Sequence, residues 1–131
     1  MNPIQDHKRF KFNEKIDQDW LYSLYEDDYA YIAEVFNSGI ESFREDLPLL
    51  TAAFESSDIH GLKRAAHKLK PVFGFAGLLQ HQEMMARFEN ACANATGTSN
   101  LTMQYIELME VISEGKAILQ EDYNRLTAFT S

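Results

Sequence analysis

Residues 64–78, RAAHKLKPVFGFAGL, place a histidine among basic side chains in a segment with helical spacing. Four apolar positions follow one another at steps of four, three and four, which predicts one buried stripe on a helix: Leu62, Ala66, Leu69 and Phe73. At roughly 100° per residue, His67 lies about 140–160° from Leu62 and Leu69 and should face solvent. An exposed imidazole is partly unprotonated near neutral pH and is then a competent nucleophile.

Basic residues surround this histidine. Lys63 and Arg64 lie one turn before His67, Lys68 is adjacent and Lys70 lies one turn after. If His67 took up a phosphoryl group, Lys70 would offset the new negative charge, and the earlier pair would add a favourable field. An ordinary solvated helix face also carries such charges, so the pattern alone leaves open that His67 is a simple surface histidine.

The residues that follow bear on how a partner could approach. Gly74 lies two turns after His67 and has almost no side chain, so a partner's active site could come close. Alternatively, Gly74 ends the helix in a left-handed conformation. Pro71 removes the backbone hydrogen bond that would satisfy the His67 carbonyl, so we expect a bend. Phe75 is either core or part of an apolar contact patch near His67.

Helical spacing recurs along the chain, and no run shows sustained strand alternation with turns at short spacing. We expect a short helix capped by Asp17 or Asp19, then a helix capped by Asp27 or Asp28. This second helix carries an apolar stripe from Ile32 to Phe54, with a kink or short break at Pro48. A third helix, capped by Ser57 or Asp58, should end at about Phe73. Further helices should cover about 77–95 and, after the loop NATGTSN, about 101–126. Short connections favour an all-α, antiparallel four-helix bundle with a short extra N-terminal helix. We expect residues 1–15 to be a flexible or loosely docked tail and residues 16–131 to form the bundle domain.

Composition argues against several classes of protein. The net charge of -8 does not suit nucleic acid, which needs a basic surface. No apolar run reaches about 18 residues, so we expect no membrane span. The first residues lack the apolar core of a secretory signal, and Cys92, the only cysteine, cannot form an internal disulfide. We therefore expect a cytoplasmic protein.

Metal and enzyme chemistry find little support. His60 and His67 are two turns apart, about 10 Å along a helix, which is too far for one ion without outside ligands. His81 and Cys92 form another candidate pair, but a core or rim position suits His81 better. There is no glycine-rich nucleotide loop and no nucleophile with a recognisable base. We expect no metal site and no enzyme activity.

The segment AHKLKPVFGFAGL resembles the signature of histidine-containing phosphotransfer (HPt) domains. That signature has an alanine-histidine pair, then a hydrophobic residue, a lysine and a glycine at two, three and ten positions after the histidine. In this chain they are Ala66-His67, Leu69, Lys70 and Gly77. Phe88-Glu89 matches a hydrophobic residue and glutamate that the family tends to show on the next helix. The chain differs at Pro71, where the family commonly has glycine.

The resemblance implies a phosphorelay intermediate of two-component signalling. His67 would accept a phosphoryl group from a receiver-domain aspartyl phosphate and pass it to another receiver aspartate. Lys70 would stabilise the phosphoryl group, and Gly77 would be a structural glycine after the histidine helix. The receivers would belong to a hybrid sensor histidine kinase and a response regulator and would bring their own Mg²⁺, so this chain needs no cofactor.

Candidates for contact with these partners surround His67: Lys63, Arg64, Lys68, Gly74 and Phe75. We expect a monomer that carries a phosphoryl group rather than an enzyme. The alternative is a helical adaptor that binds receiver domains without accepting phosphate.

Overall fold

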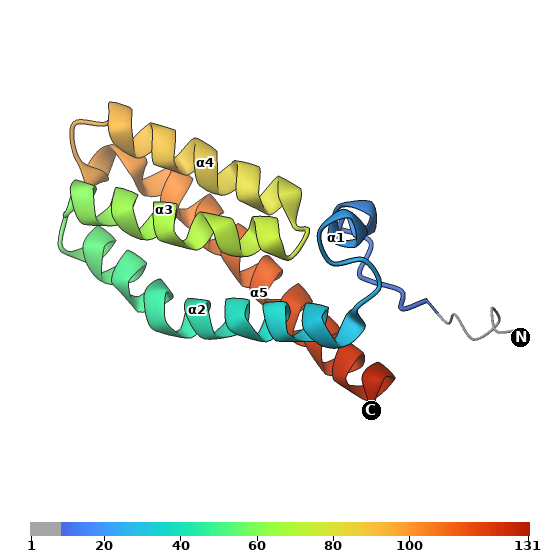
Figure 1. Ribbon diagram of the computed structural model, residues 1–131. Coiled ribbons are helices and arrows are strands. Elements are labelled where there is room, and N and C mark those ends of the chain that lie inside the picture. The colour runs from blue at the N-terminus through green and yellow to red at the C-terminus, as the bar shows by residue number, and fades with distance from the viewer. Residues whose placement is uncertain (1–8) are drawn as a thin grey trace, which may run out of the picture.

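The computed structural model describes residues 9–131, which contain helices and no strand. The helices are α1 (Gln18–Tyr25), α2 (Tyr29–Glu55), α3 (Ile59–Phe75), α4 (Leu79–Asn94), the 3₁₀ turn η2 (Thr98–Leu101) and α5 (Thr102–Thr130). The four long helices form an antiparallel bundle, and α1 lies at one end of it (Figure 1). The expected all-α bundle with a short extra N-terminal helix is therefore confirmed.

Each long helix packs mainly against two neighbours, so α3 lies between α2 and α4, and α5 closes the bundle against the same two helices. The outer face of α3 is left open. Because α3 carries the stripe Leu62, Ala66, Leu69 and Phe73, all with no exposed surface, the opposite side of the helix must face solvent.

Local sequence signals set the helix starts. Side chains of Asp17, Asp28 and Asp58 accept hydrogen bonds from the backbone N–H three residues on, at 3.0, 3.1 and 2.9 Å, and so cap α1, α2 and α3. The helix α2 runs without interruption through Pro48, so of the kink or short break expected there, the break is absent.

The turn between α3 and α4 depends on Gly77. Its φ is +79°, in the left-handed region that glycine adopts at little cost. Its carbonyl accepts a hydrogen bond from Asp17 N at 2.9 Å, which joins this turn to the start of α1. A β-carbon at Gly77 would lie 3.1 Å from side-chain atoms of Ile16 and Leu21. The turn therefore favours glycine, through its left-handed backbone and through the limited space around it.

The N-terminal segment differs from the expected tail. Phe10, Phe12 and Ile16 are each only 5% exposed and join the core. The backbone N–H of Asn13 donates to the fully buried Asp122 carboxylate at 2.7 Å. The expectation of a flexible or loosely docked tail is thus wrong for residues 9–15, and its remainder, 1–8, lies outside the described residues.

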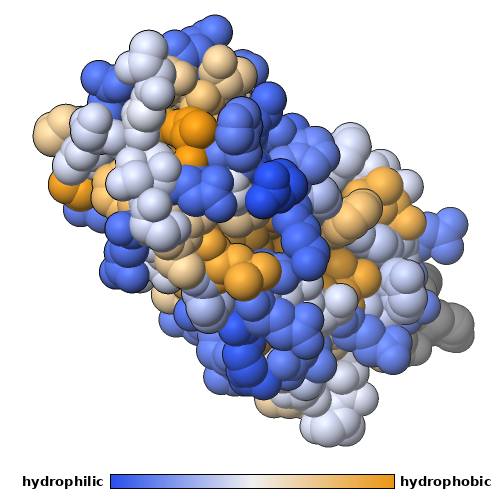
Figure 2. All heavy atoms as spheres, turned by 90° about the vertical axis from the view of Figure 1, so that its left-hand side faces the viewer, coloured by the Kyte–Doolittle hydropathy of each residue, from blue (hydrophilic) through white to orange (hydrophobic). Residues whose placement is uncertain are grey.

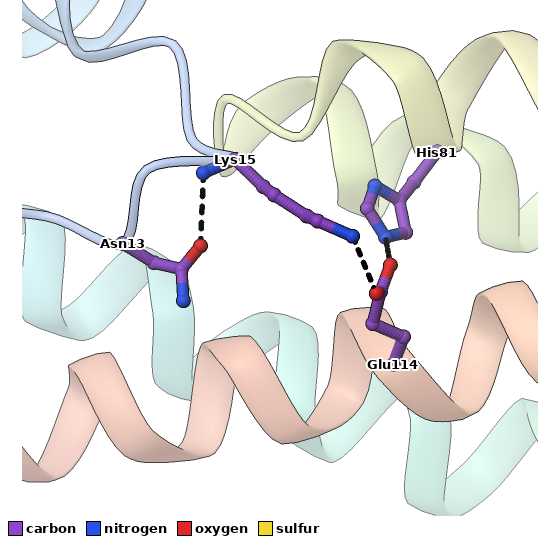
Figure 3. Close-up of polar contacts among 4 residues, drawn as sticks. All are labelled: Asn13, Lys15, His81 and Glu114. Atoms are coloured by element: carbon purple, nitrogen blue, oxygen red, sulfur yellow. Dashed lines mark hydrogen bonds and ion pairs between the residues drawn. The ribbon is translucent and has the colours of Figure 1, made fainter.

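A polar cluster also fastens this segment to the bundle (Figure 3). Glu114 of α5 accepts from Lys15 Nζ at 2.6 Å and lies 2.9 Å from Nε2 of His81 on α4. His81 is only 5% exposed and packs against the Phe73 ring. The structure thus places His81 in the core, as the sequence favoured, with a carboxylate partner.

The surface offers no obvious membrane segment. No helix within residues 9–131 is long and apolar enough to cross a bilayer. At the end of the bundle that carries the α2–α3 and α4–α5 connections, hydrophobic side chains lie in separate patches among hydrophilic ones (Figure 2).

Candidate functional site

The imidazole of His67 projects from the outer face of α3, and its side chain is 68% exposed. This agrees with the position predicted from helical spacing. Its Nδ1 lies 2.6 Å from Oε2 of Glu89, which α4 presents alongside α3. The other ring nitrogen, Nε2, is directed away from this contact. A partner can therefore reach Nε2 without entering a pocket.

The carboxylate of Glu89 joins the two residues that the sequence picked out. Its Oε1 lies 2.8 Å from Lys70 Nζ, while its Oε2 faces His67. Burial raises the pKa of Glu89, but Lys70 first and His67 second outweigh this effect, so the pKa lies below its ordinary value. Glu89 is thus ionised near neutral pH and can only accept hydrogen bonds.

The tautomer of His67 follows from this charge. Because the Glu89 carboxylate only accepts, Nδ1 must carry the proton and donate it. In the neutral ring, Nε2 then holds the free electron pair. The geometry presents the nitrogen with the free electron pair to solvent and keeps the protonated one against α4.

The neighbouring cations differ in their surroundings. Lys68 Nζ lies 3.2 Å from Oδ1 of Asp46, a buried carboxylate on α2. Lys63 and Arg64 are exposed and make no ion pair with any residue of the described part of the chain. Helices on both sides of α3 thus supply carboxylates to the two lysines closest to His67 in sequence.

Pro71 is accommodated within α3. The helix continues to Phe75, and the proline ring is exposed. Pro71 has no N–H to give to the His67 carbonyl. Since His67 lies on the solvent side, water can hydrate that carbonyl, and the helix needs no break.

An open groove of about 540 Å³ runs between α2 and α3 on the Lys68 side of His67. Among its lining residues, Phe75 and Tyr31 are 58% and 50% exposed. The Tyr25 hydroxyl donates to the Phe75 carbonyl at 2.9 Å and fixes α1 beside the groove. The structure therefore brings an apolar aromatic surface close to the basic side of α3, and Phe75 belongs to that surface rather than to the core.

Gly74 is not the open position that the sequence suggested. It is helical, so it is not a left-handed cap, but it is buried. Its carbonyl accepts from the Trp20 indole at 2.9 Å, and a β-carbon at Gly74 would clash with the side-chain amide of Gln82. The prediction of an open path over Gly74 is wrong, because α4 and α1 both cover this end of α3.

Sequence reasoning missed the contacts of Glu89 and Asp46. The signal for Glu89 lay in the antiparallel register of α3 and α4. Gly74 lies seven positions after His67, and Glu89 lies seven positions after Gln82 on the returning helix. Once Gln82 is opposite Gly74, Glu89 must be opposite His67. No comparable short-range pattern pointed to Asp46.

Metal coordination finds no support in the described residues. Within residues 9–131, no group of three or more histidine, cysteine or carboxylate side chains could hold an ion. His81 and Cys92 are both buried on α4, and the partner of His81 is Glu114.

Similarity to known proteins extends over most of this chain. The sequence model of the Hpt domain family matches residues 34–128, which reach from α2 into α5. The chain is similar to the phosphorelay intermediate protein rdeA of Dictyostelium discoideum, with 29% identity over 91 residues that cover 70% of this chain and 36% of that protein. It therefore spans only about a third of that relative's length. No solved structure matches. Since the family match covers well over half of it, this chain belongs to the Hpt domain family.

Proposed function

We propose that the chain is a phosphorelay carrier whose phosphoryl acceptor is Nε2 of His67. The observation that carries this proposal is the 2.6 Å contact between Glu89 and Nδ1, which leaves Nε2 as the exposed nucleophile. The donor would be an aspartyl phosphate on a receiver domain, and the final acceptor another receiver aspartate. Mg²⁺ would belong to the receivers.

This role requires position and charge rather than a catalytic pocket. Phosphoryl transfer depends mainly on alignment of the reacting groups and on neutralisation of the phosphoryl charge. Lys70, one turn after His67, would offset the charge of a phosphoryl group on His67, and Lys63 and Arg64 would add to the field. We propose a carrier, not an enzyme, that acts as a cytoplasmic monomer between a hybrid kinase and a response regulator.

The receiver would dock over the α2–α3 groove and the outer face of α3. Exposed aromatic side chains are common anchors of protein interfaces, and Phe75 and Tyr31 provide two of them beside Lys68. Substitution of Phe75 by alanine should weaken receiver binding about tenfold, while leaving the helix content unchanged. If the variant bound the receiver as tightly as the wild type does, the groove would not be part of the interface.

Transfer from a panel of phosphorylated receiver domains, followed by intact mass measurement, tests the acceptor. One phosphoryl group should appear on the wild-type chain, should be lost in acid and should survive alkali. The variant His67→Gln should stay unlabelled. The control His60→Gln, which changes another exposed histidine of α3, should be labelled normally. Full labelling of His67→Gln would refute the assignment. Receiver binding without any labelling of the wild type would favour the adaptor.

A further inference from the structure

We propose that the outer side of α5, with the groove between α5 and α2, is a docking surface for a basic amphipathic helix of a partner protein. This α5 surface lies diagonally across the bundle from His67, because α3 and α5 each pack on α2 and α4 (Figure 1). The inference concerns a second partner and does not depend on the proposed carrier function.

Two shallow hollows meet along α5. One, of about 420 Å³, lies between α2 and α5 and has Leu47 on its α2 side. The other, of about 640 Å³, lies on the outer side of α5 and includes Ile106. Met109, Ser113 and Ala117 line both hollows, so the two form one continuous surface.

The dimensions of this surface suit a helix. Its lining residues on α5 run from Tyr105 to Gln120, about 22 Å along the axis, which is the length of a helix of about 15 residues. Ser113 and Ala117 are small and exposed, so a second helix can approach α5 closely at the centre. Ile106 is 52% exposed and provides apolar area that a partner would cover. Amphipathic helices bind such grooves through apolar residues at helical spacing.

Acidic side chains follow one edge of the α5 surface. Helical spacing places four of them on one side of α5: Glu107, Glu110, Glu114 and Glu121. Glu114 already pairs with groups of the bundle, whereas the other three are exposed and make no ion pair within residues 9–131. Lysine or arginine side chains of a partner helix would complement this edge.

The opposite edge of the surface has the other sign of charge. Lys116 lines the groove beside α2, is exposed and has no ion-pair partner in the described part of the chain. A partner helix with basic residues on one flank and an acidic residue on the other would therefore fit in a single orientation.

The acidic edge disfavours other occupants. An anionic membrane surface would be repelled by the three unpaired carboxylates. In a two-fold antiparallel pairing with a second copy of this chain, equivalent edges of the two α5 helices meet. The acidic edge of each copy would then face the acidic edge of the other, which is unfavourable. A basic helix of another protein meets neither obstacle.

A helix bound to the α5 surface would leave the outer face of α3 open. Under the proposed function, the chain could then be held by one partner while a receiver approaches His67. If that partner also carried the receiver, the linkage would raise the effective concentration of the receiver without a change in its own affinity.

The test uses synthetic helical peptides of about 15 residues, the length that covers the surface. The first has leucines along one side and lysines elsewhere, the second has the same residues in scrambled order, and the third has glutamate in place of lysine. Fluorescence anisotropy gives the affinity of each peptide for the whole chain, and backbone NMR shifts of the wild type locate the binding site.

Two matched pairs of variants test the apolar and the charged contacts. Ile106→Lys removes an exposed apolar side chain of the surface, and its control Leu49→Lys makes the same kind of change at a leucine of α2 that is 56% exposed and lies outside both hollows. Glu110→Gln neutralises the acidic edge, and its control Glu45→Gln neutralises an exposed carboxylate of α2.

The basic amphipathic peptide should bind the wild type and shift the resonances of the α5 surface, whereas the scrambled and acidic peptides should not bind. Binding should be weaker by about tenfold or more in Ile106→Lys and by about two- to fivefold in Glu110→Gln. Both control variants should bind as the wild type does.

Shifts confined to another face of the wild type would overturn the inference, and this readout needs no variant. Equal binding of the scrambled peptide, or equal effects of Ile106→Lys and Leu49→Lys, would also overturn it. Sedimentation that shows a wild-type dimer, dissociated by Ile106→Lys, would assign the surface to a second copy instead. Binding to phosphatidylcholine vesicles that Ile106→Lys abolishes would assign it to a membrane and would likewise refute the partner helix.

Discussion

Replacement of Lys70 by alanine should alter both stability and phosphoryl transfer. An exposed lysine usually contributes no more than about 0.5 kcal/mol to the free energy of unfolding. Lys70, however, is only 27% exposed and holds the Glu89 carboxylate, which is 14% exposed, at 2.8 Å. Its removal leaves a partly buried carboxylate with His67 as its one remaining partner. We expect the free energy of unfolding to fall by about 1 kcal/mol, a value between those for exposed and fully buried ion pairs.

The effect on transfer follows from Coulomb's law. A lysine ammonium about 5–6 Å from a phosphoryl oxygen, at an effective dielectric constant of about 40, contributes roughly 1.5 kcal/mol. That free energy corresponds to a rate change of about tenfold. Transfer to His67 in the Lys70→Ala variant should therefore be about ten times slower than in the wild type.

Urea unfolding and rapid-quench transfer assays on Lys70→Ala and Lys63→Ala provide the measurement. Lys63 lies on the same helix but makes no ion pair within residues 9–131, so its variant should match the wild type in stability. NMR titration should also show a higher pKa for Glu89 in Lys70→Ala, because Lys70 is the larger of the two groups that lower it. If Lys70→Ala matched Lys63→Ala in all three measurements, Lys70 would be only a surface charge.

The remaining predictions concern glycine, cysteine and acid. Gly77→Ala should lower the free energy of unfolding by about 2 kcal/mol, because a left-handed backbone is strained for alanine and the added β-carbon is crowded. An unchanged urea midpoint would contradict this. The free energy of unfolding of Gly74→Ala should stay within about 1 kcal/mol of the wild-type value, because the gain in helix propensity offsets the displacement of Gln82. Phosphoryl transfer to this variant should be normal. A loss of transfer without a loss of stability would support the access role of Gly74. Cys92 should resist alkylation in the folded protein at pH values well below its pKa of about 11 and react on unfolding. Because the pKa of Glu89 is lowered by folding, its contribution to stability should be present above about pH 4.3 and be lost as acid protonates the folded form; equal acid sensitivity of Glu89→Gln would refute this.

The parts of this fold that follow from local chemistry could be predicted from the sequence. The spacing of Leu62, Ala66, Leu69 and Phe73 determined which face of α3 is buried and therefore where His67 points. The aspartates before the first three helices acted as caps because their side chains satisfy N–H groups only three residues away.

The docking of residues 9–15 depends on distant partners and could not be predicted in this way. Asn13 finds its acceptor in Asp122, which is more than one hundred positions further along the chain. The segment has alternating apolar residues but no helical period, so pattern analysis alone gave it no place in the core. Only the assembled bundle provides the surface on which Phe10 and Phe12 become buried.

The error at Gly74 has the same origin as the missed role of Glu89. Helical spacing correctly put Gly74 and His67 on one side of α3, but it could not identify which side chains of α4 contact that side. In the structure, α4 covers the end at Gly74 with Gln82 and meets His67 with Glu89. The packing of α4 against α3 therefore decides which half of this face of α3 remains exposed.

This packing also explains how the chain can both accept and release a phosphoryl group under the proposed function. Lys68 and Lys70 already have carboxylate partners in Asp46 and Glu89. A phosphoryl group on His67 must compete with those carboxylates for each ammonium group. Each lysine would then exchange its carboxylate for the phosphoryl group, instead of forming an ion pair where it had none. Such an exchange provides less net stabilisation than a new ion pair would. The phosphoryl group is consequently held by modest electrostatic forces, as a carrier that must pass it on requires.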